Sequence, residues 1–424
     1  MKIVVIAGGR GTRIASVNAD IPKAMIPVGG KPVLEHQLEM ALRQGFRDFI
    51  FVTGHLGDAI SAHFGDGSAW GANIEYFRET QPMGTAGALA CLKDRLQEDF
   101  FVFYGDTVMD VDLAAMLRSH TANRADATLL VHPNDHPFDS DIVFLAGDGR
   151  VEGFAFKPHP EGFISRNLVN ASLFIFSPRV TERIEPGVKS HIEKDVLPRC
   201  LRDGLRVFGY RSAEYIKDMG TPERYLQVSR DVALGRVERM NRSHPRPAFF
   251  LDRDGTLNRE AGFLNRAEQM ELLPGAAAAV RLINSSGCLA IVVTNQPVIA
   301  RGDCTWEELN LINAKLETLL GAESAYLDDI YVCPHHPDRG FPGERPEYKT
   351  ACDCRKPRPG MLLRAAREWN IDLSRSFMIG DSERDVQAGG NAGVLRSVQV
   401  ETNRDGALLE AVRQCLENEK KQIQ

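Results

Sequence analysis

Short apolar runs alternate along the chain with longer stretches in which apolar residues recur every three or four positions. The short runs are bounded by glycine and polar residues, as in buried parallel strands, and the longer stretches are typical of amphipathic helices. In the first half of the chain, the predicted strands are 3–7, 49–53, 100–104 and 173–176, and the predicted helices are 33–44 and 87–96. Such alternation predicts an α/β fold with helices on both faces of a sheet.

The pattern stops between residues 235 and 247, where two prolines stand among charged and polar residues. This composition predicts an exposed linker between a first domain, residues 1–234, and a second domain, residues 248–424. In the second domain, the predicted strands are 248–251, 289–294 and 377–380, and the predicted helices are 307–320, 360–369 and 407–417. The last helix carries its apolar residues on one side, so we expect it to pack on the domain.

Length and charge narrow the class of protein. A chain of 424 residues fits two or three domains, at roughly 150 residues per domain. Its 51 basic and 57 acidic side chains give a net charge of -6, so no overall positive field attracts nucleic acid or an anionic membrane. No apolar run approaches the roughly 18 residues that span a bilayer. We therefore expect a cytoplasmic protein that binds neither nucleic acid nor membrane.

A glycine-rich loop follows the first predicted strand. It reads Gly-Gly-Arg-Gly-Thr-Arg over residues 8–13, and its backbone amides can surround a triphosphate while Arg13 pairs with the phosphate oxygens. A plain strand-to-helix turn explains the glycines alone equally well. Lys23 follows between two prolines, at a short distance along the chain, and could meet the same phosphates.

Several motifs occur in a set order through the first domain. They are 8–13, Pro-Lys at 22–23, Gly-Gly-Lys-Pro at 29–32, Gly-Thr-Ala-Gly at 84–87, Tyr-Gly-Asp at 104–106 and Lys-Asp-Met-Gly-Thr-Pro at 217–222. Together they resemble the sugar-1-phosphate nucleotidylyltransferases over most of residues 1–234. The resemblance implies a Rossmann-like, GT-A-like mixed sheet and transfer of a nucleoside monophosphate from an NTP to a sugar phosphate.

The same resemblance assigns roles to individual residues. It implies that Gly8, Gly9, Arg13 and Lys23 hold the nucleotide phosphates, that Gln81 and Gly84 lie beside the base, that Asp106 and Asp218 hold Mg²⁺, and that Lys157 and Asn170 contact the sugar. Mg²⁺ prefers oxygen ligands and keeps water or substrate oxygens in its shell, so two aspartates form a suitable, incomplete set. Taken singly, Asp106 also suits a strand-end turn, and Asp218 a loop or helix cap.

The first domain also departs from the general family pattern. Residues 14–20 replace the usual Leu-x-Pro-Leu-Thr and look more like the heptose-1-phosphate guanylyltransferase branch. Phe156 stands where an acidic residue usually precedes the Lys-Pro pair, and Ser172 stands where the family usually has glycine after Asn-Ala. Details of sugar recognition therefore differ from the general pattern.

A second set of motifs begins with Asp252 and Asp254, directly after a predicted strand. Two carboxylates one residue apart can divide nucleophile and acid/base work, although either aspartate alone suits a turn. Later motifs at 293–296, 354–357 and 379–381 follow in order. The set resembles the haloacid dehalogenase-like phosphatases over about residues 248–400 and implies a Rossmannoid domain that hydrolyses phosphate esters.

This second resemblance also implies residue roles. Asp252 would attack phosphorus to form an aspartyl phosphate, and Asp254 would act as acid and then base. Thr294 and Asn295 would bind the phosphoryl oxygens, and Lys356 would neutralise their charge. Mg²⁺ would be held by Asp252, the Asp254 carbonyl and Asp381, with Asp385 in support.

Three cysteines and two histidines gather between residues 333 and 354. Cys333, His335, Cys352 and Cys354 have the residue types and spacing of a structural Zn²⁺ site, which would staple a loop rich in proline. His336 is the competing fourth ligand, and reduced free thiols are the alternative to metal. A zinc loop of this kind resembles one phosphatase branch, which includes heptose 1,7-bisphosphate 7-phosphatases and histidinol-phosphate phosphatases. Arg355 and Arg358 are candidates for gripping a second substrate phosphate, although both also suit a solvated basic loop.

The two resemblances together select a substrate. One product feeds the other site if the second domain removes the 7-phosphate of heptose 1,7-bisphosphate and the first domain activates the resulting 1-phosphate, with GTP the expected donor. The expected partners are thus an NTP and sugar phosphates, and the expected cofactors are Mg²⁺ in both domains and Zn²⁺ in the second. The alternatives are a histidinol-phosphate phosphatase fused to an unrelated nucleotidylyltransferase, and an inactive sugar-nucleotide sensor.

Overall fold

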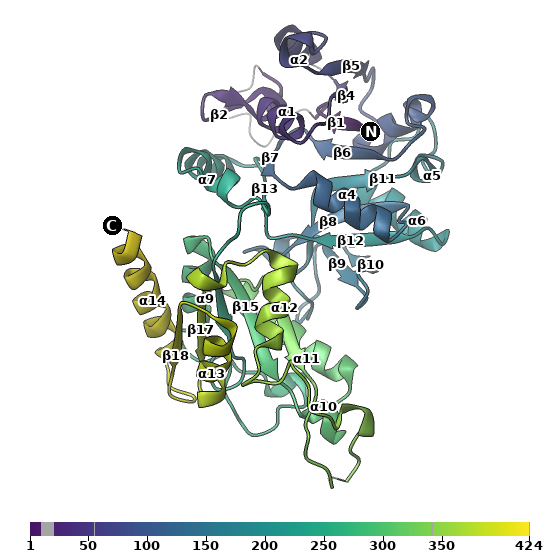
Figure 1. Ribbon diagram of the computed structural model, residues 1–424. Helices are drawn as coiled ribbons and strands as arrows, with labels where there is room; N and C mark the ends of the chain where they lie inside the picture. Colours follow the sequence, from purple (N-terminus) through teal and green to yellow (C-terminus); the bar gives the residue numbers. More distant parts are fainter. Residues whose placement is uncertain (10–20, 55, 341, 424) are drawn as a thin grey trace. The chain divides into compact units, whose positions relative to one another are not determined.

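The computed structural model describes residues 1–9, 21–54, 56–340 and 342–423, which form two compact units (Figure 1). The first unit contains residues 1–132, 143–156 and 170–241, and the second contains 133–142, 157–169 and the chain from residue 242 onward. The break at 241/242 lies inside the stretch expected to be a linker. No sequence pattern indicated that two segments from within the first half of the chain pack with the second unit.

The first unit is built on a nine-stranded mixed sheet. Seven strands run in the order β10-β9-β11-β6-β1-β4-β5, and β8 joins β11 to β12. These strands are β1 (Lys2–Ile6), β4 (Asp48–Thr53), β5 (Asn73–Arg78), β6 (Phe100–Tyr104), β8 (Ala127–His132), β9 (Ile142–Leu145), β10 (Val151–Ala155), β11 (Val169–Phe176) and β12 (Val207–Arg211). Strands β4, β1 and β6 are parallel, and β11 is antiparallel to β6. The predicted α/β class with a mixed sheet is confirmed.

Helices cover both faces of this sheet because consecutive residues of its central strands are apolar and point to opposite faces. Ile3 and Val5 face a core that includes residues of α1 (Val33–Arg43), α2 (Gly57–Phe64) and α4 (Leu113–Ala122). Val4 faces the opposite core, with residues of α3 (Gly84–Cys91) and α6 (Leu197–Arg202). The expected helix 87–96 is instead α3 followed by a short 3-10 turn, Lys93–Arg95.

Smaller elements complete the first unit. The two-stranded pairs are β2 (Pro27–Val28) with β3 (Lys31–Pro32), and β7 (Thr107–Asp110) with β13 (Tyr215–Asp218); the remaining helices are α5 (Pro178–Thr181), α7 (Pro222–Ala233) and α8 (Arg236–Arg239). Helix α8 lies in the stretch expected to be an exposed linker, and Val237 is buried in a cluster with Val28 and Met219. The expectation of an exposed linker is therefore wrong there, because an apolar side chain finds a core that local composition does not reveal.

Ser172 adopts a left-handed backbone conformation, with φ 59°. This is the position where the resembled family usually has glycine, and glycine reaches this region without the steric cost of a Cβ atom. We expect Ser172→Gly to raise the free energy of unfolding of the first unit by about 0.5–1 kcal/mol. Ser177→Gly is the matched control, since Ser177 has φ -80° and gains nothing from glycine. Equal effects of the two substitutions in denaturant unfolding would contradict this explanation.

The second unit contains a five-stranded parallel sheet in the order β16-β15-β14-β17-β18. Its strands are β14 (Ala248–Leu251), β15 (Leu289–Asn295), β16 (Asp329–Cys333), β17 (Phe377–Gly380) and β18 (Arg396–Gln399); its helices are α9 (Ala276–Ser286), α10 (Val298–Arg301), α11 (Trp306–Ala322), α12 (Gly360–Trp369), α13 (Glu383–Ala392) and α14 (Ala407–Ile423). Phe249 and Leu251 of the central strand face a core shared with α9, α11 and α14. Helices α12 and α13 contact strands of the sheet as well.

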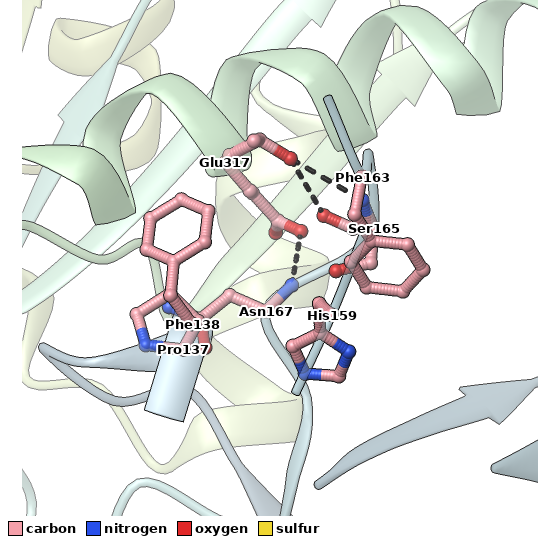
Figure 2. Close-up of a pocket in the computed structure, with 8 residues that line it drawn as sticks. Pro137, Phe138, His159, Phe163, Ser165, Asn167 and Glu317 are labelled. Carbon is pink, nitrogen blue, oxygen red and sulfur yellow. Dashed lines mark hydrogen bonds between the residues drawn. The ribbon is translucent and has the colours of Figure 1, made fainter. Parts of the chain in front are cut away.

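Two segments that lie between strands of the first sheet pack on α11 in the second unit. They are residues 133–142, which connect β8 to β9, and residues 157–169, which connect β10 to β11. Figure 2 shows His159, Phe163, Ser165 and Asn167 of the longer segment around Glu317 of the helix. None of the helices formed by the described residues combines the length and the apolar composition that a bilayer-spanning segment needs.

Candidate active sites

The first candidate site lies where β1 and β6 end. The two strands are parallel neighbours, with Ile6 opposite Tyr104, and the amide of Gly105 donates a hydrogen bond to the Ile6 carbonyl at 3.0 Å. Gly8 and Gly9 follow one strand, and Asp106 follows the other. Because the carboxyl ends of parallel strands meet at one edge of a sheet, the glycine loop begins beside Asp106. Arg13 lies outside the described residues.

The residues around Gly8 leave no room for a side chain at this position. A Cβ atom placed there would collide with the carboxylate of Glu79 and would lie 3.5 Å from the amide nitrogen of Gly54. Glu79 is half-buried, and burial raises the pKa of its carboxyl. One Glu79 oxygen also accepts a hydrogen bond from the amide of Met83 at 3.2 Å. Glu79 therefore supports both the glycine loop and the segment that precedes Gly84, a role that no sequence motif indicated.

Lys23, Asp106 and Asp218 come together at this edge. Strand β7 pairs with β13 so that Thr107 lies opposite Asp218, and the amide of Met219 donates to the Asp106 carbonyl at 3.1 Å. The Lys23 ammonium forms an ion pair with the Asp106 carboxylate. Arg224 forms one with Asp218, at 2.6 Å between Nη1 and Oδ2. Arg224 was not predicted, although its place in the first turn of α7, three residues after the capping Thr221, is visible in the sequence.

Gly84 is held against Ser190. It has φ 77°, and a Cβ atom there would collide with the Ser190 carbonyl oxygen. The same carbonyl accepts a hydrogen bond from the amide of Ala86 at 3.0 Å, and the Ser190 amide donates to Met83 at 3.0 Å. Gly84 thus has a structural reason to be glycine, whether or not a base lies beside it. Gln81 is exposed.

The two predicted sugar contacts have different surroundings. Asn170 donates to the Glu193 carboxylate at 3.5 Å, and Tyr104 donates to the same oxygen at 2.6 Å. Lys157, at the start of a segment in the second unit, bonds the Asp139 carbonyl at 2.7 Å and its carboxylate at 3.0 Å. Glu193 joins Asn170 to the strand that leads to Asp106, and the sequence analysis did not identify it.

The second candidate site lies at the carboxyl edge of the parallel sheet in the second unit. Asp252 follows β14, Thr294 and Asn295 end β15, and Asp381 follows β17. These strands are neighbours, so their ends bring the second set of motifs together. A Cβ atom at Gly255 would collide with the Asp381 carboxylate, which shows how closely the loop after β14 approaches that aspartate.

Lys356 lies at the centre of the second site and is 3% exposed. Its ammonium lies 2.8 Å from Asp252 Oδ1 and 2.7 Å from Asp385 Oδ1, and it donates to the Val293 carbonyl at 2.8 Å. The Asn295 side chain bonds both the amide and the carbonyl of Lys356, at 3.0 Å and 3.1 Å. Burial would lower the pKa of Lys356, but Asp252 and Asp385 outweigh it and raise the pKa. The lysine therefore stays charged.

Three carboxylates of the second site could share a metal ion. Asp252, Asp381 and Asp385 offer oxygens that all lie within 4.8 Å of one another. Burial raises the pKa of Asp252; Lys356 opposes this shift and Asp385 adds to it. Burial also raises the pKa of Asp381. Lys356 pairs with only two of these carboxylates, so three carboxylates and one ammonium leave uncompensated negative charge, and this donor set fits a hard divalent cation.

Asp254 has a different environment from Asp252. Arg253, which is 0% exposed, donates to both Asp254 oxygens at 3.1 Å and 2.9 Å, and Asn258 and Gln296 add hydrogen bonds at 2.9 Å and 2.7 Å. Burial by itself would raise the pKa of Asp254, but Arg253 and these hydrogen bonds lower it overall. Gln296 also donates to the Thr294 hydroxyl at 2.8 Å. The orienting roles of Arg253, Asn258 and Gln296 were not predicted.

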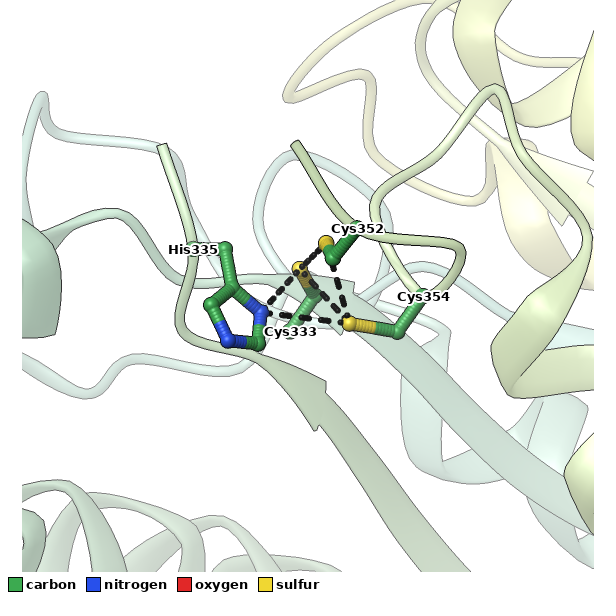
Figure 3. Close-up of side chains that lie close together, drawn as sticks. All are labelled: Cys333, His335, Cys352 and Cys354. Carbon is green, nitrogen blue, oxygen red and sulfur yellow. Dashed lines mark hydrogen bonds between the residues drawn. The ribbon is translucent and has the colours of Figure 1, made fainter. Parts of the chain in front are cut away.

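Cys333, His335, Cys352 and Cys354 form a compact cluster (Figure 3). Cys354 Sγ lies 3.3 Å from Cys333, 3.2 Å from Cys352 and 3.3 Å from His335 Nδ1. These distances are far longer than a disulfide bond, and tetrahedral Zn²⁺ with bonds of about 2.0–2.3 Å gives ligand separations of this size. The four residues can thus hold a metal ion, with no water position required.

His336 is not part of this cluster. Its amide donates to the Tyr348 carbonyl at 3.1 Å, and its Nδ1 accepts from the amide of Asp338 at 3.2 Å. The structure therefore favours His335 of the two candidates.

The two arginines expected near a second substrate phosphate are bonded to the cysteine loop. Arg355 donates to the His335 carbonyl at 3.0 Å, and Arg358 donates to the Cys352 carbonyl at 3.1 Å. Arg358 also lies 3.4 Å from the Asp353 carboxylate. Each guanidinium has further N–H groups, so these bonds fix the loop and leave donors for an anion.

Comparisons with known proteins agree with the two-part architecture. Residues 2–234 match the nucleotidyl transferase family model, and residues 353–415 match the HAD-hydrolase-like model. A mannose-1-phosphate guanylyltransferase of Mycobacterium tuberculosis (strain ATCC 25618 / H37Rv) is 36% identical over 234 residues, which cover 55% of this chain and 64% of the relative. This chain thus spans slightly less than two thirds of that relative.

The C-terminal part has relatives of its own. D-glycero-beta-D-manno-heptose-1,7-bisphosphate 7-phosphatases of Rhodopseudomonas palustris (strain ATCC BAA-98 / CGA009) and Escherichia coli (strain K12) are both 40% identical, over 156 and 158 residues. These matches cover 37% of this chain and 84% and 81% of the relatives. A solved structure from Bacillus anthracis, described as a glucose-1-phosphate thymidylyltransferase in complex with a sucrose, has a TM-score of 0.50 at 20% identity. It covers 56% of this chain and 95% of its own, and it supports the fold of the first unit.

The strand-end carboxylates, the ordered motifs and these matches lead to one conclusion. The chain belongs to the nucleotidyl transferase family through its N-terminal part and to the HAD-like hydrolases through its C-terminal part.

Proposed function

We propose that the chain is a bifunctional enzyme that makes a nucleotide-activated heptose. The C-terminal part would hydrolyse the 7-phosphate of D-glycero-D-manno-heptose 1,7-bisphosphate, and the N-terminal part would transfer GMP from GTP to heptose 1-phosphate with release of pyrophosphate. The observation that carries this proposal is the intact cluster of Asp252, Lys356, Asp381 and Asp385 in a chain whose relatives are heptose bisphosphate phosphatases and a sugar-1-phosphate guanylyltransferase. We further propose that the enzyme acts in the cytoplasm.

In the phosphatase reaction, the Asp252 carboxylate would attack phosphorus in line and form an aspartyl phosphate. Lys356 holds Asp252 in place at 2.8 Å and would neutralise charge on the phosphoryl oxygens. The Asn295 side chain fixes the Lys356 backbone, and the Thr294 hydroxyl would donate to a phosphoryl oxygen. Mg²⁺, if held by Asp252, Asp381, Asp385 and the Asp254 carbonyl, would supply charge neutralisation for the transferring group.

Asp254 would transfer protons in both halves of this reaction. Its lowered pKa keeps the carboxylate ionised, so it has a free acceptor site for the proton of the attacking water when the aspartyl phosphate is hydrolysed, although its basicity is reduced. As an acid towards the leaving oxygen it would first have to take up a proton, against the stabilising effect of Arg253. Arg253, Asn258 and Gln296 hold its carboxylate in one orientation for both steps.

In the nucleotidyl transfer, no covalent intermediate is required, because the sugar phosphate attacks the α-phosphorus directly. Catalysis then depends on alignment and on compensation of phosphate charge. We propose that Lys23, with Arg13 and the amides after Gly8 and Gly9, binds the triphosphate and that Asp106 and Asp218 present oxygens to Mg²⁺. Asp106, in the turn before β7, and Asp218, at the end of the paired strand β13, offer the oxygen donors that this ion prefers, and each carboxylate already has a cationic partner, Lys23 or Arg224.

A coupled assay tests this function. Purified protein would be given heptose 1,7-bisphosphate and each of the four NTPs in turn, while phosphate, pyrophosphate and sugar nucleotide are followed together. We expect phosphate release without any NTP, and sugar nucleotide formation fastest with GTP. Phosphate release from histidinol phosphate but not from the heptose bisphosphate would contradict the substrate assignment.

Asp106→Asn is expected to lower nucleotidyl transfer about 10²-fold or more, because it removes a charged ligand at the reacting phosphates. Phosphate release should stay unchanged, since Asp252 and its partners belong to the other unit. Asp94→Asn is the matched control, because Asp94 is an exposed aspartate in a 3-10 turn of the same unit. Equal loss of both activities in Asp106→Asn would contradict two independent sites.

A further inference from the structure

Helix α11 of the phosphatase-like half carries a buried carboxylate that faces the segment before β11. Glu317 is 4% exposed, and its Oε2 lies 2.6 Å from Arg166 Nε and accepts the amide of Asn167 at 2.9 Å. Burying a carboxylate is unfavourable unless it is paired and hydrogen-bonded. Both partners of Glu317 come from residues 157–169, so this contact fixes that segment specifically (Figure 2).

Neighbouring contacts extend the attachment. The Thr318 hydroxyl bonds both the amide and the carbonyl of Ser165, at 3.2 Å each. Asn167, itself 3% exposed, is joined to Asn134 by two hydrogen bonds of 2.7 Å and 3.2 Å, which tie together the two segments that pack on α11. A Cβ atom at Gly321 would lie 2.6 Å from Pro137, so the second segment also touches the helix closely.

The attached segment leads directly into the first candidate site. Only Leu168 and Val169 separate Asn167 from Asn170, and Val169 is the first residue of β11. Asn170 shares the Glu193 carboxylate with Tyr104, the last residue before the Gly105-Asp106 turn. Asn167 and Asn170 are therefore linked by a short stretch of backbone, through which a shift at Asn167 can reach Asn170.

We propose that Glu317 is a positioning residue for nucleotidyl transfer: by holding Arg166 and Asn167, it places Asn170 to receive the sugar 1-phosphate. The inference rests on the proposed function of the N-terminal part, and it assigns to the phosphatase-like half a share in the other reaction. The class of ligand affected is the sugar phosphate, because the nucleotide side of the site, at Gly8 and Lys23, is supported by other contacts.

The same helix also supports the phosphatase site. Asn313, one turn before Glu317, accepts a hydrogen bond from Arg253 at 3.1 Å, and Arg253 holds Asp254. Damage to the helix as a whole would therefore impair phosphate release, whereas loss of the Glu317 contacts alone would not. Phosphatase activity in the same preparation is thus an internal measure of helix integrity.

The test compares Glu317→Ala, Glu317→Gln and the control Glu307→Gln, an exposed position on the same helix. For Glu317→Ala we expect the KM for the sugar 1-phosphate to rise about 10-fold, the effect of losing charge-assisted hydrogen bonds at a buried site. The KM for the NTP and the rate of phosphate release should stay within about twofold. Glu317→Gln should show a smaller rise, because its amide oxygen can still accept the Asn167 amide, and Glu307→Gln should show none.

An unchanged KM for the sugar 1-phosphate in Glu317→Ala would overturn the proposal, as would an equal rise in both KM values. If Glu317→Ala fails to fold, Thr318→Val decides: it removes the two bonds to Ser165 without burying a new charge, and it should raise the same KM several-fold. An unchanged KM in a folded Thr318→Val protein would likewise overturn it. All measurements use the sugar 1-phosphate that the unsubstituted protein accepts. A wrong heptose assignment therefore appears in the unsubstituted protein, and a wrong role for Glu317 appears only in the variants.

Discussion

Asp252→Asn is expected to reduce phosphate release about 10⁴-fold, the scale of losing a nucleophile in other enzymes. An amide cannot attack phosphorus, and it also removes the negative partner of Lys356 at 2.8 Å. Nucleotidyl transfer to supplied heptose 1-phosphate should stay within about twofold. Initial rates of phosphate and pyrophosphate release from the same preparation measure both effects.

Asp405→Asn is the matched control for this substitution, since Asp405 is an exposed aspartate of the same unit. It should leave both rates unchanged. Two results would contradict the assignment of Asp252: phosphate release above about 1% of normal in Asp252→Asn, or parallel loss of nucleotidyl transfer in a protein with normal thermal unfolding.

Cys354→Ser is expected to abolish stoichiometric zinc binding and to destabilise the second unit by part of the roughly 10–16 kcal/mol that binding of a structural zinc ion supplies. Cys354 contacts all three other members of the cluster, so its loss removes one vertex of the tetrahedron. The loop from Cys333 to Cys354 contains little regular structure beyond the 3-10 turn Pro346–Tyr348 among its described residues, so few other contacts replace the metal. Metal analysis and thermal unfolding check the two effects.

Cys91→Ser is the control, because Cys91 is an exposed thiol outside the cluster. It should change neither the metal content nor the unfolding temperature. Less than about half an equivalent of zinc in freshly prepared, reduced protein would count against the metal staple, and so would an unaltered unfolding transition in Cys354→Ser.

The strands and the local parts of both sites were predictable from the sequence because their signals are local. The strands 100–104, 248–251 and 377–380 agree with β6, β14 and β17 residue for residue, since each is an almost fully buried apolar run bounded by polar residues, proline or glycine. Asp252, Lys356 and Asp381 were found by motif order, and parallel strand pairing explains why they meet.

Other parts of the sites depend on contacts between residues that are distant in sequence. Glu193 belongs to no recognised motif, and it is connected to the site by the hydrogen bond from Tyr104, 89 residues earlier. Arg253 looks like an ordinary charged residue, and only the structure shows that it is fully buried between Asp254 and Asn313. Arg166 and Asn167 bind Glu317, about 150 residues later, and no periodic pattern in either segment indicates this contact.

Helix α11 also bears on how such a fusion could be divided. Asn313 and Glu317 stand about 6 Å apart along its axis, and one supports a group of the hydrolase while the other holds a segment that interrupts the transferase sheet. A gene split after residue 241 would give a transferase fragment that lacks helix α11. In this fragment Arg166 would have lost Glu317 as its ion-pair partner, and the buried Asn134 and Asn167 would be exposed to solvent. Ancestral or engineered halves that work as separate polypeptides would therefore need substitutions in residues 133–142 and 157–169 that make these segments stable as solvent-exposed loops.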